Sequence, residues 1–257
     1  MRIILACAIA SILSVPAKAQ EKVSFPSADG TVLTGYLYKP AGPGPFAAVV
    51  GLHGCGGLKA TVPAYGLYEQ WGKILSGKGY FALFVDSLEP RRRDTLCGET
   101  RIEPLTEVTR DAVGGLNYLQ SRPDVRPDSI VIIGWSYGAN ATMLTIANGA
   151  LPERDFRAAI AFYPGCRSLL DAHWRPRLPM LLLMGDTDNV VRPAVCKELA
   201  DVVGPPIDAH FYPNAHHLFD HPTLPISASP LGTIGSNPEA RADAINRVTQ
   251  FLARQLQ

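Results

Sequence analysis

The sequence predicts an α/β fold, in which a mostly parallel central sheet carries helices on both faces. Short, continuously apolar runs, typical of strands buried on both faces, alternate along the chain with segments of helical periodicity. No internal repeat or linker divides the 257 residues, so we expect a single domain over residues 20–257. With 24 Lys+Arg against 23 Asp+Glu, the chain also lacks the basic surplus typical of nucleic-acid-binding proteins.

Residues 1–19 have the pattern of a secretory signal peptide. Arg2 gives a positive start, an apolar run of about a dozen residues follows, and Ala17 and Ala19 form an A-x-A cleavage motif. The apolar run is shorter than the roughly 20 residues that a bilayer-spanning helix needs. We therefore expect export across the inner membrane, to the periplasm or the extracellular medium, and no membrane contact by the mature chain.

Seven segments are predicted to be strands, because each is short, apolar and bounded by turn-forming residues. In chain order they are Val32–Tyr38, Ala47–Leu52, Phe81–Val85, Ile130–Ile133, Ala158–Phe162, Met180–Met184 and Ala209–Tyr212. Most of them are apolar at every position, which predicts that they lie in the interior of the sheet.

Five segments between and after these strands have apolar residues at helical spacing. They are Tyr65–Leu75, Pro104–Gln120, Ala139–Asn148, Pro193–Val203 and Glu239–Gln255. The segment 222–238 is rich in Pro, Ser and Gly instead, and we expect it to be a long surface loop and a candidate lid over a site.

The strongest local motif begins directly after the fourth predicted strand. It reads Gly134-Trp135-Ser136-Tyr137-Gly138, and small residues at helical spacing follow it. G-x-S-x-G between a buried strand and a helix is typical of a nucleophile elbow. We therefore expect Ser136 to be a nucleophile, and the Tyr137 amide, at a helix N-terminus, to stabilise an oxyanion.

A serine nucleophile needs a base, and the base needs an acid that orients it. In the fold that carries this elbow, the acid and then the base follow the serine, each just after a strand. The sixth predicted strand is followed by Asp186 and Asp188, and the seventh by His216 and His217. These residues are the candidates, and the spacing alone leaves the choice within each pair open.

The second predicted strand leads into another glycine-rich turn, His53-Gly54-Cys55-Gly56-Gly57. Glycines here let the backbone approach a bound carbonyl oxygen, and we expect the Cys55 amide to be the second oxyanion donor. His53 is expected to brace the turn by hydrogen bonding, and it is also an alternative base. The Cys55 thiol is an alternative nucleophile, but it lacks the context of an elbow.

Together these motifs resemble the dienelactone hydrolase family of the α/β-hydrolase superfamily, over essentially all of the mature length. The aspartate of that family lies three residues after a glycine, which selects Asp188 after Gly185. Its histidine lies two residues before a phenylalanine, which selects His217 before Phe219. The resemblance therefore implies an α/β-hydrolase fold with a triad of Ser136, Asp188 and His217.

The chain departs from the family's pattern in three places. Dienelactone hydrolases proper are cytoplasmic and use a cysteine nucleophile, which a glutamate from an early loop holds. This chain has Ser136 at the elbow, no glutamate in the turn at 53–57, and a predicted leader. The resemblance therefore implies the family, and it does not imply dienelactone as the substrate.

Arg91, Arg92 and Arg93 follow the third predicted strand, in a loop that opens at the same edge of the sheet as the elbow. An arginine there can bind a substrate carboxylate through two hydrogen bonds, as arginines do in the family's cysteine enzymes. Salt bridges within a solvated loop are the alternative. The three arginines are candidate substrate-binding residues.

Four cysteines remain after the predicted leader, in an oxidising compartment where an even number favours disulfides. Cys55 and Cys97 lie in loops after two neighbouring strands at the edge that carries the elbow. Cys166 and Cys196 are similarly placed on the next pair of strands. Of the three possible pairings, we predict Cys55–Cys97 with Cys166–Cys196.

The predicted function is hydrolysis of a small carboxylic ester through an acyl-enzyme, with no metal or organic cofactor. His216, His217, Asp220 and His221 also suggest a metal cluster, but a metal there would compete with His217 as the base. The alternatives are a peptidase or thioesterase on the same fold, and a binding protein on an inactive hydrolase scaffold. The sequence indicates no oligomeric state.

Overall fold

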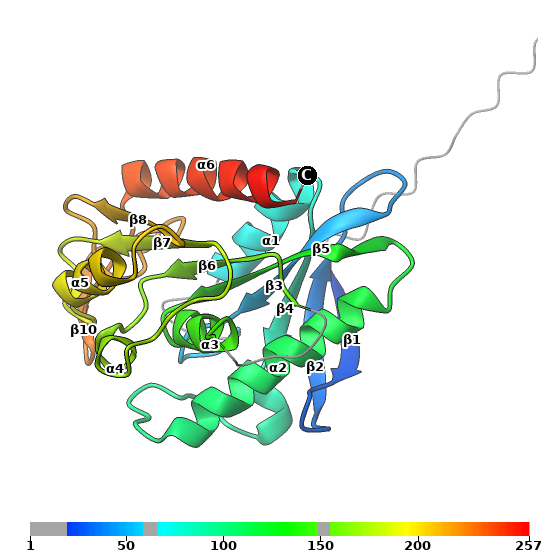
Figure 1. The fold of residues 1–257 in the computed structure, drawn as a ribbon, viewed down its shortest axis with the longest axis horizontal. Helices are drawn as coiled ribbons and strands as arrows, with labels where there is room; N and C mark the ends of the chain where they lie inside the picture. Colours follow the sequence, from blue (N-terminus) through cyan, green and yellow to red (C-terminus); the bar gives the residue numbers. More distant parts are fainter. Residues whose placement is uncertain (1–19, 59–65, 149–154, 257) are drawn as a thin grey trace, which may run out of the picture.

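The computed structural model describes residues 20–58, 66–148 and 155–256, which form an eight-stranded, mostly parallel sheet between layers of helices (Figure 1). The strands are β1 (Glu21–Pro26), β2 (Val32–Tyr38), β3 (Phe46–Leu52), β4 (Phe81–Asp86), β5 (Val125–Trp135), β6 (Ala158–Phe162), β7 (Met180–Gly185) and β8 (Ile207–Tyr212). Their order in the sheet is β1-β2-β4-β3-β5-β6-β7-β8. Only the β1–β2 and β2–β4 pairs of this sheet are antiparallel, so the predicted α/β architecture is confirmed.

Helices cover both faces of the sheet. α1 (Leu67–Gly77) and α6 (Pro238–Gln255) lie on one face, and α2 (Ile102–Gln120) and α3 (Tyr137–Thr145) lie on the other (Figure 1). The short helix α4 (Arg167–Asp171) packs against α5 (Pro193–Val203), which also contacts β8. Because parallel strands end at the same edge of a sheet, the loops after β3, β4, β5, β6, β7 and β8 gather there.

Most of the predicted elements agree with the structure. β2, β6 and α5 have the expected bounds, and every residue of β4 and β7 is buried. The sequence pattern did not reveal β1 or α4. β1 is an edge strand of mostly exposed residues, and α4 has only five residues, too few for a periodic signal.

The segment 222–238 is not the continuous loop that the sequence predicted. Its chain forms an antiparallel hairpin of β9 (Ser227–Ser229) and β10 (Gly232–Ile234). Ile234 forms a bridge with His217, and the Thr233 amide donates to Asn189 Oδ1 at 2.7 Å. The hairpin is therefore held against the loops that carry the predicted acid and base.

The predicted signal peptide, residues 1–19, lies outside the described residues. Within the three described ranges, no helix is long and apolar enough to cross a membrane. Within the same ranges, no three His, Cys, Asp or Glu side chains are grouped so as to hold a metal ion.

Candidate active site

Ser136 lies on the tight turn between β5 and α3, where its φ is 53° and its ψ is −113°. Positive φ is strained for a residue with a side chain, so the surrounding contacts must hold it. A Cβ on Gly134 would collide with the Gly138 carbonyl, and one on Gly138 would collide with the Leu52 carbonyl. The Ser136 amide also donates to the Phe162 carbonyl at 2.9 Å. The turn therefore has the geometry expected of a nucleophile elbow.

His217 joins Ser136 to Asp188 through two hydrogen bonds. Its Nε2 lies 3.0 Å from Ser136 Oγ, and its Nδ1 lies 2.7 Å from Asp188 Oδ2. Asp188 Oδ1 accepts the amides of Val190 and Val191 at 2.9 and 3.1 Å, which fixes the carboxylate. The side chains of Asp188 and His217 are 0% and 6% exposed. In this arrangement Nε2 can take the serine proton while the carboxylate holds the proton on Nδ1.

Asp186 and His216, the other two candidates, point to other partners. Asp186 Oδ1 accepts the Asn214 amide at 2.8 Å and so caps the turn after β8. His216 Nδ1 lies 3.3 Å from the Thr187 carbonyl oxygen. The geometry therefore brings Asp188 and His217, and neither of their neighbours, to the serine.

His53 braces the glycine-rich turn after β3. Its Nε2 accepts the Ser87 amide at 3.1 Å, and its Nδ1 donates to the Gly54 carbonyl at 2.7 Å. Burial lowers the pKa of His53, which favours the neutral ring that these two bonds require. Because both ring nitrogens are engaged, His53 is not available as a base for Ser136.

The glycine-rich turn and the elbow lie against each other. A Cβ on Gly54 would be 3.6 Å from the Cβ of Ser136. The Gly54 amide is not available as an oxyanion donor, because it donates to the Tyr68 hydroxyl at 2.8 Å. Among the described residues, no protein acceptor takes the Cys55 or the Tyr137 amide. These two amides are therefore the candidate oxyanion donors.

The contacts of Arg91 do not favour the predicted role in substrate binding. The Arg91 side chain is 9% exposed, and it donates twice to Asp111 on α2, at 2.7 and 2.8 Å. Its Nη2 and Nε also face Asp29 and Glu107, at 3.2 and 3.4 Å, so no edge of the guanidinium is left for a substrate. Arg93 pairs with Glu107 through two N–H groups and is partly exposed, and Arg92 is exposed. Arg92 and Arg93 stay candidates.

Both predicted disulfides are present. The Cα atoms of Cys55 and Cys97 are 4.7 Å apart, and those of Cys166 and Cys196 are 5.1 Å apart. The first joins the glycine-rich turn to the loop before α2, and the second joins the start of α4 to α5. They therefore tie together segments at the edge of the sheet where Ser136 lies.

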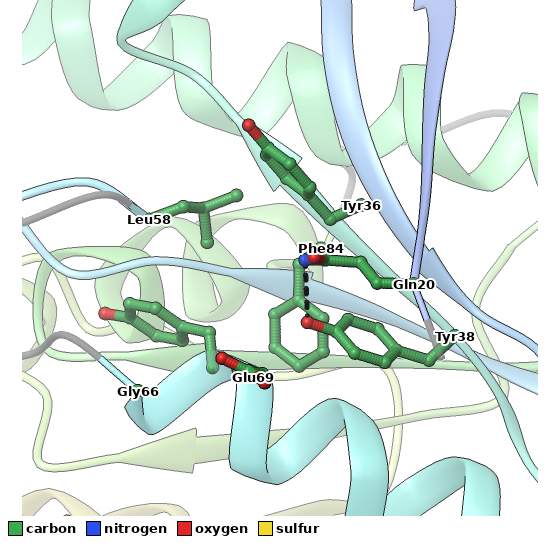
Figure 2. Close-up of a pocket in the computed structure, with 8 residues that line it drawn as sticks. Gln20, Tyr36, Tyr38, Leu58, Gly66, Glu69 and Phe84 are labelled. Carbon is green, nitrogen blue, oxygen red and sulfur yellow. Dashed lines mark hydrogen bonds between the residues drawn. The ribbon is translucent and has the colours of Figure 1, made fainter. Parts of the chain in front are cut away.

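A pocket of about 270 Å³ lies between α1 and the strands β2 and β4 (Figure 2). It is lined largely by aromatic rings, those of Tyr36, Tyr38, Tyr68 and Phe84. Gln20 donates to the Tyr38 hydroxyl at 2.8 Å beside them (Figure 2). Ser136 is not among the lining residues, so the pocket is distinct from the candidate triad.

The sequence did not predict the positions of Tyr163 and Asp220, which lie close to the triad. The Tyr163 ring packs on the His217 ring, with centroids 4.4 Å apart. Asp220, considered above only as a metal ligand, is fully buried among aromatic side chains. The available signals were a tyrosine directly after a buried strand and an acid three residues after the histidine, directly after Leu218 and Phe219.

Known proteins resemble this chain in sequence over about half of its length. The sequence profile of the dienelactone hydrolase family matches residues 33–256. Thiohydrolase apmlB of Arthrinium phaeospermum is 31% identical over 144 residues, which are 56% of this chain and 43% of that protein. Esterase EstD of Thermotoga maritima is 32% identical over 129 residues, 46% of this chain and 29% of that protein. The match therefore spans less than half the length of either curated relative.

Solved structures share the fold. A putative dienelactone hydrolase from Klebsiella pneumoniae has a TM-score of 0.68 at 17% identity, over 91% of this chain and 98% of that chain. Dienelactone hydrolase from Anabaena variabilis has a TM-score of 0.67 at 20% identity, over 93% and 100%. These likenesses show the α/β-hydrolase fold. Because the family profile covers nearly the whole of that fold, the chain belongs to the dienelactone hydrolase family.

Proposed function

We propose that this protein is an exported serine hydrolase that cleaves small carboxylic esters. The observation that supports this most strongly is the unbroken chain of hydrogen bonds from Ser136 Oγ through His217 to Asp188. A serine on an elbow, followed in sequence by the acid and then the base, suits acyl transfer. The family and the curated esterase relative support an ester as the bond that is cleaved.

In the proposed acylation step, His217 Nε2 takes the hydroxyl proton while Ser136 Oγ attacks the ester carbonyl carbon. The oxyanion that forms accepts hydrogen bonds from the Cys55 and Tyr137 amides. When the tetrahedral intermediate collapses, the C–O bond to the alcohol breaks and Nε2 protonates the leaving oxygen. Asp188 keeps the proton on Nδ1 and stabilises the imidazolium in both steps.

Water then releases the acyl group. His217 takes a proton from the water molecule while the water oxygen attacks the acyl carbon. Collapse of the second intermediate breaks the bond to Ser136 Oγ, which recovers a proton from Nε2. The products are an alcohol, a carboxylic acid and the starting enzyme, and every proton passes between substrate, water, Ser136 and His217.

A thioester is the second candidate substrate class, because one curated relative is named a thiohydrolase. The same acyl-enzyme would form, with a thiol as the leaving group. No comparable observation favours a peptidase or a binding protein.

A substrate panel on the purified protein tests the proposal. It compares p-nitrophenyl esters, acyl thioesters of the same chain lengths, and a peptide p-nitroanilide. We expect ester turnover that disappears in Ser136→Ala and persists in Asp186→Asn, which removes a carboxylate from the same loop as Asp188. Faster turnover of thioesters would favour the second candidate. Binding of intact esters without turnover would instead identify a binding protein.

Export is supported by the pattern of residues 1–19 and by the two disulfides, which persist in oxidising compartments. Expression of the full chain in a bacterium, followed by fractionation and N-terminal sequencing, tests this part of the proposal. We expect a periplasmic or extracellular protein that begins at Gln20. A cytoplasmic protein that retains Met1 would contradict it.

A further inference from the structure

Asp220 is a carboxylate with no solvent exposure that the proposed reaction does not use. Its Oδ2 accepts the indole N–H groups of Trp71 and Trp135 at 2.7 and 2.8 Å. Its Oδ1 accepts the Tyr163 hydroxyl at 2.7 Å. Arg241 reaches only the main-chain oxygen of Asp220, at 3.0 Å. Among the described residues, the donors to this buried carboxylate are therefore all neutral.

Two of these donors are directly beside catalytic candidates. Trp135 immediately precedes Ser136 on the elbow, so a fixed indole helps to fix the strained turn. Tyr163 packs its ring on His217, with centroids 4.4 Å apart. Asp220 itself lies on the loop that carries His217, three residues further along the chain. One carboxylate thus joins the two loops whose separation sets the distance between the nucleophile and the base.

The third donor extends the same network toward the candidate oxyanion turn. Trp71 lies on α1 together with Tyr68, whose hydroxyl binds the Gly54 amide. Both rings pack against Trp135, with centroids 5.9 Å and 5.5 Å away. The contacts of Asp220 therefore reach all three parts of the candidate site.

The pattern of donors fits the ionised form of Asp220. An indole N–H can only donate, so Oδ2 carries no proton. A proton on Oδ1 would turn the Tyr163 hydroxyl into an acceptor and displace the hydrogen that it now donates. Burial raises the pKa of Asp220 above its ordinary value, and the hydrogen bonds from Tyr163, Trp135 and Trp71 offset only part of that rise.

We propose that Asp220 is a positioning residue, which stabilises the imidazolium of His217 through Tyr163 and holds the base against the elbow. This inference rests on the proposed serine hydrolase function. A negative charge in a buried site favours a nearby cation. A hydrogen bond from the Tyr163 hydroxyl to that charge also polarises the ring that lies against the imidazole.

The other charges near His217 have different positions. Asp188 binds Nδ1 directly, and the β10 residue that bridges to His217, Ile234, does not titrate. His216 faces Thr187, and His221 Nδ1 accepts the Thr223 amide. The titratable or charged side chains on the loops around the ring include those of Asp186, Asp188, Tyr163, His216, Asp220, His221 and Arg241. Asp186 caps the turn after β8, so Asp220 is the buried carboxylate among them that the triad itself does not account for.

Two variants separate the charge of Asp220 from its shape. In Asp220→Asn, the amide oxygen can still accept both indoles and the amide nitrogen can donate to Tyr163, so mainly the charge is lost. In Tyr163→Phe, the ring and the charge remain and only the hydrogen bond between them is lost. Asp186→Asn is the matched control, because it removes a carboxylate that caps a turn and does not face the ring.

The readout is the rate at which a fluorophosphonate labels Ser136, measured between about pH 5 and pH 9, the range in which histidines titrate. In the wild type we expect the rate to rise with pH to a plateau. In Asp220→Asn and Tyr163→Phe, a less stabilised imidazolium moves the midpoint to lower pH, by about half a unit or more. For a half-unit shift the plateau falls by up to about threefold, because proton transfer to His217 is less favourable.

Each outcome bears on a different claim. If the folded wild type is not labelled at Ser136, the proposed function fails. If it is labelled, and both variants melt cooperatively but keep the wild-type midpoint of the pH profile, the inference about Asp220 fails and the proposed function stands. If Asp220→Asn does not fold, Tyr163→Phe decides the matter by the same criterion. Asp186→Asn is expected to keep the wild-type profile, and an equal shift in that variant would also contradict the inference.

Discussion

Two polar loops at the same edge of the sheet use buried charge in different ways. The loop after β7 carries Asp188, whose charge faces His217 and, through it, Ser136. The loop after β4 carries Arg91, whose charge faces Asp111 on α2. Both side chains are nearly buried and paired. Burial and pairing are therefore not enough to identify a functional charge. What distinguishes Asp188 from Arg91 is that the partner of Asp188 is itself hydrogen-bonded to the nucleophile.

The largest expected effect concerns the loop after β7. Asp188→Asn is expected to lower kcat for ester hydrolysis by about 10⁴-fold, because the amide no longer holds the productive tautomer of His217. Asp186→Asn is the control, with an expected change of about twofold or less. The measurement is kcat on a p-nitrophenyl ester with melting curves for both variants. Similar losses in the two variants would show that the whole loop, and not the Asp188 carboxylate, is required.

In the loop after β4, a substitution is expected to lower stability and to leave catalysis unchanged. Arg91→Ala leaves Asp111 buried without its cation, so the free energy of unfolding is expected to fall by about 3–5 kcal/mol. The kcat of the folded enzyme is expected to stay near the wild-type value. Urea unfolding curves and kcat per labelled active site measure the two quantities. Arg92→Ala is the control for an exposed side chain, and a wild-type stability of Arg91→Ala would contradict this account of the loop.

The contrast also shows what local patterns can and cannot predict. Ser136, Asp188 and His217 each follow a recognisable apolar strand, so short motifs and a family resemblance were enough to select them. The partner of Arg91 lies 20 residues away on the buried face of α2, and nothing in the loop itself points to it. Asp220 meets Trp71 across 149 residues and Trp135 across 85, contacts that depend on the completed fold.

The two disulfides are expected to contribute similarly to stability but differently to catalysis. Replacement of Cys166 and Cys196 together by serine is expected to lower the free energy of unfolding by about 2–4 kcal/mol, because the unfolded chain gains freedom. The same replacement of Cys55 and Cys97 is expected to cost a similar amount and also to lower kcat, since the Cys55 amide is a proposed oxyanion donor. Denaturation curves and kcat for both double variants test this, and equal kcat values in the two would argue against Cys55.

The smallest expected effect concerns Arg93, the partly exposed arginine of the loop after β4. Arg93 follows β4 in the loop at the edge of the sheet that also carries the elbow, and its side chain pairs with Glu107. Arg93→Ala is expected to raise KM for an ester with a free carboxylate by about two- to fivefold, the effect of an exposed ion pair. KM for a neutral ester of the same size is the control. An equal rise for both esters would remove Arg93 from the substrate-binding candidates.

The central claim is that the loops after β5, β7 and β8 meet to activate one serine. Stoichiometric reaction with a fluorophosphonate, followed by peptide mapping, tests it most directly. The account predicts one label per chain, on the peptide that contains Ser136, with none in Ser136→Ala and much slower labelling in His217→Ala. Labelling at another residue, or labelling of Ser136→Ala at the wild-type rate, would contradict the account.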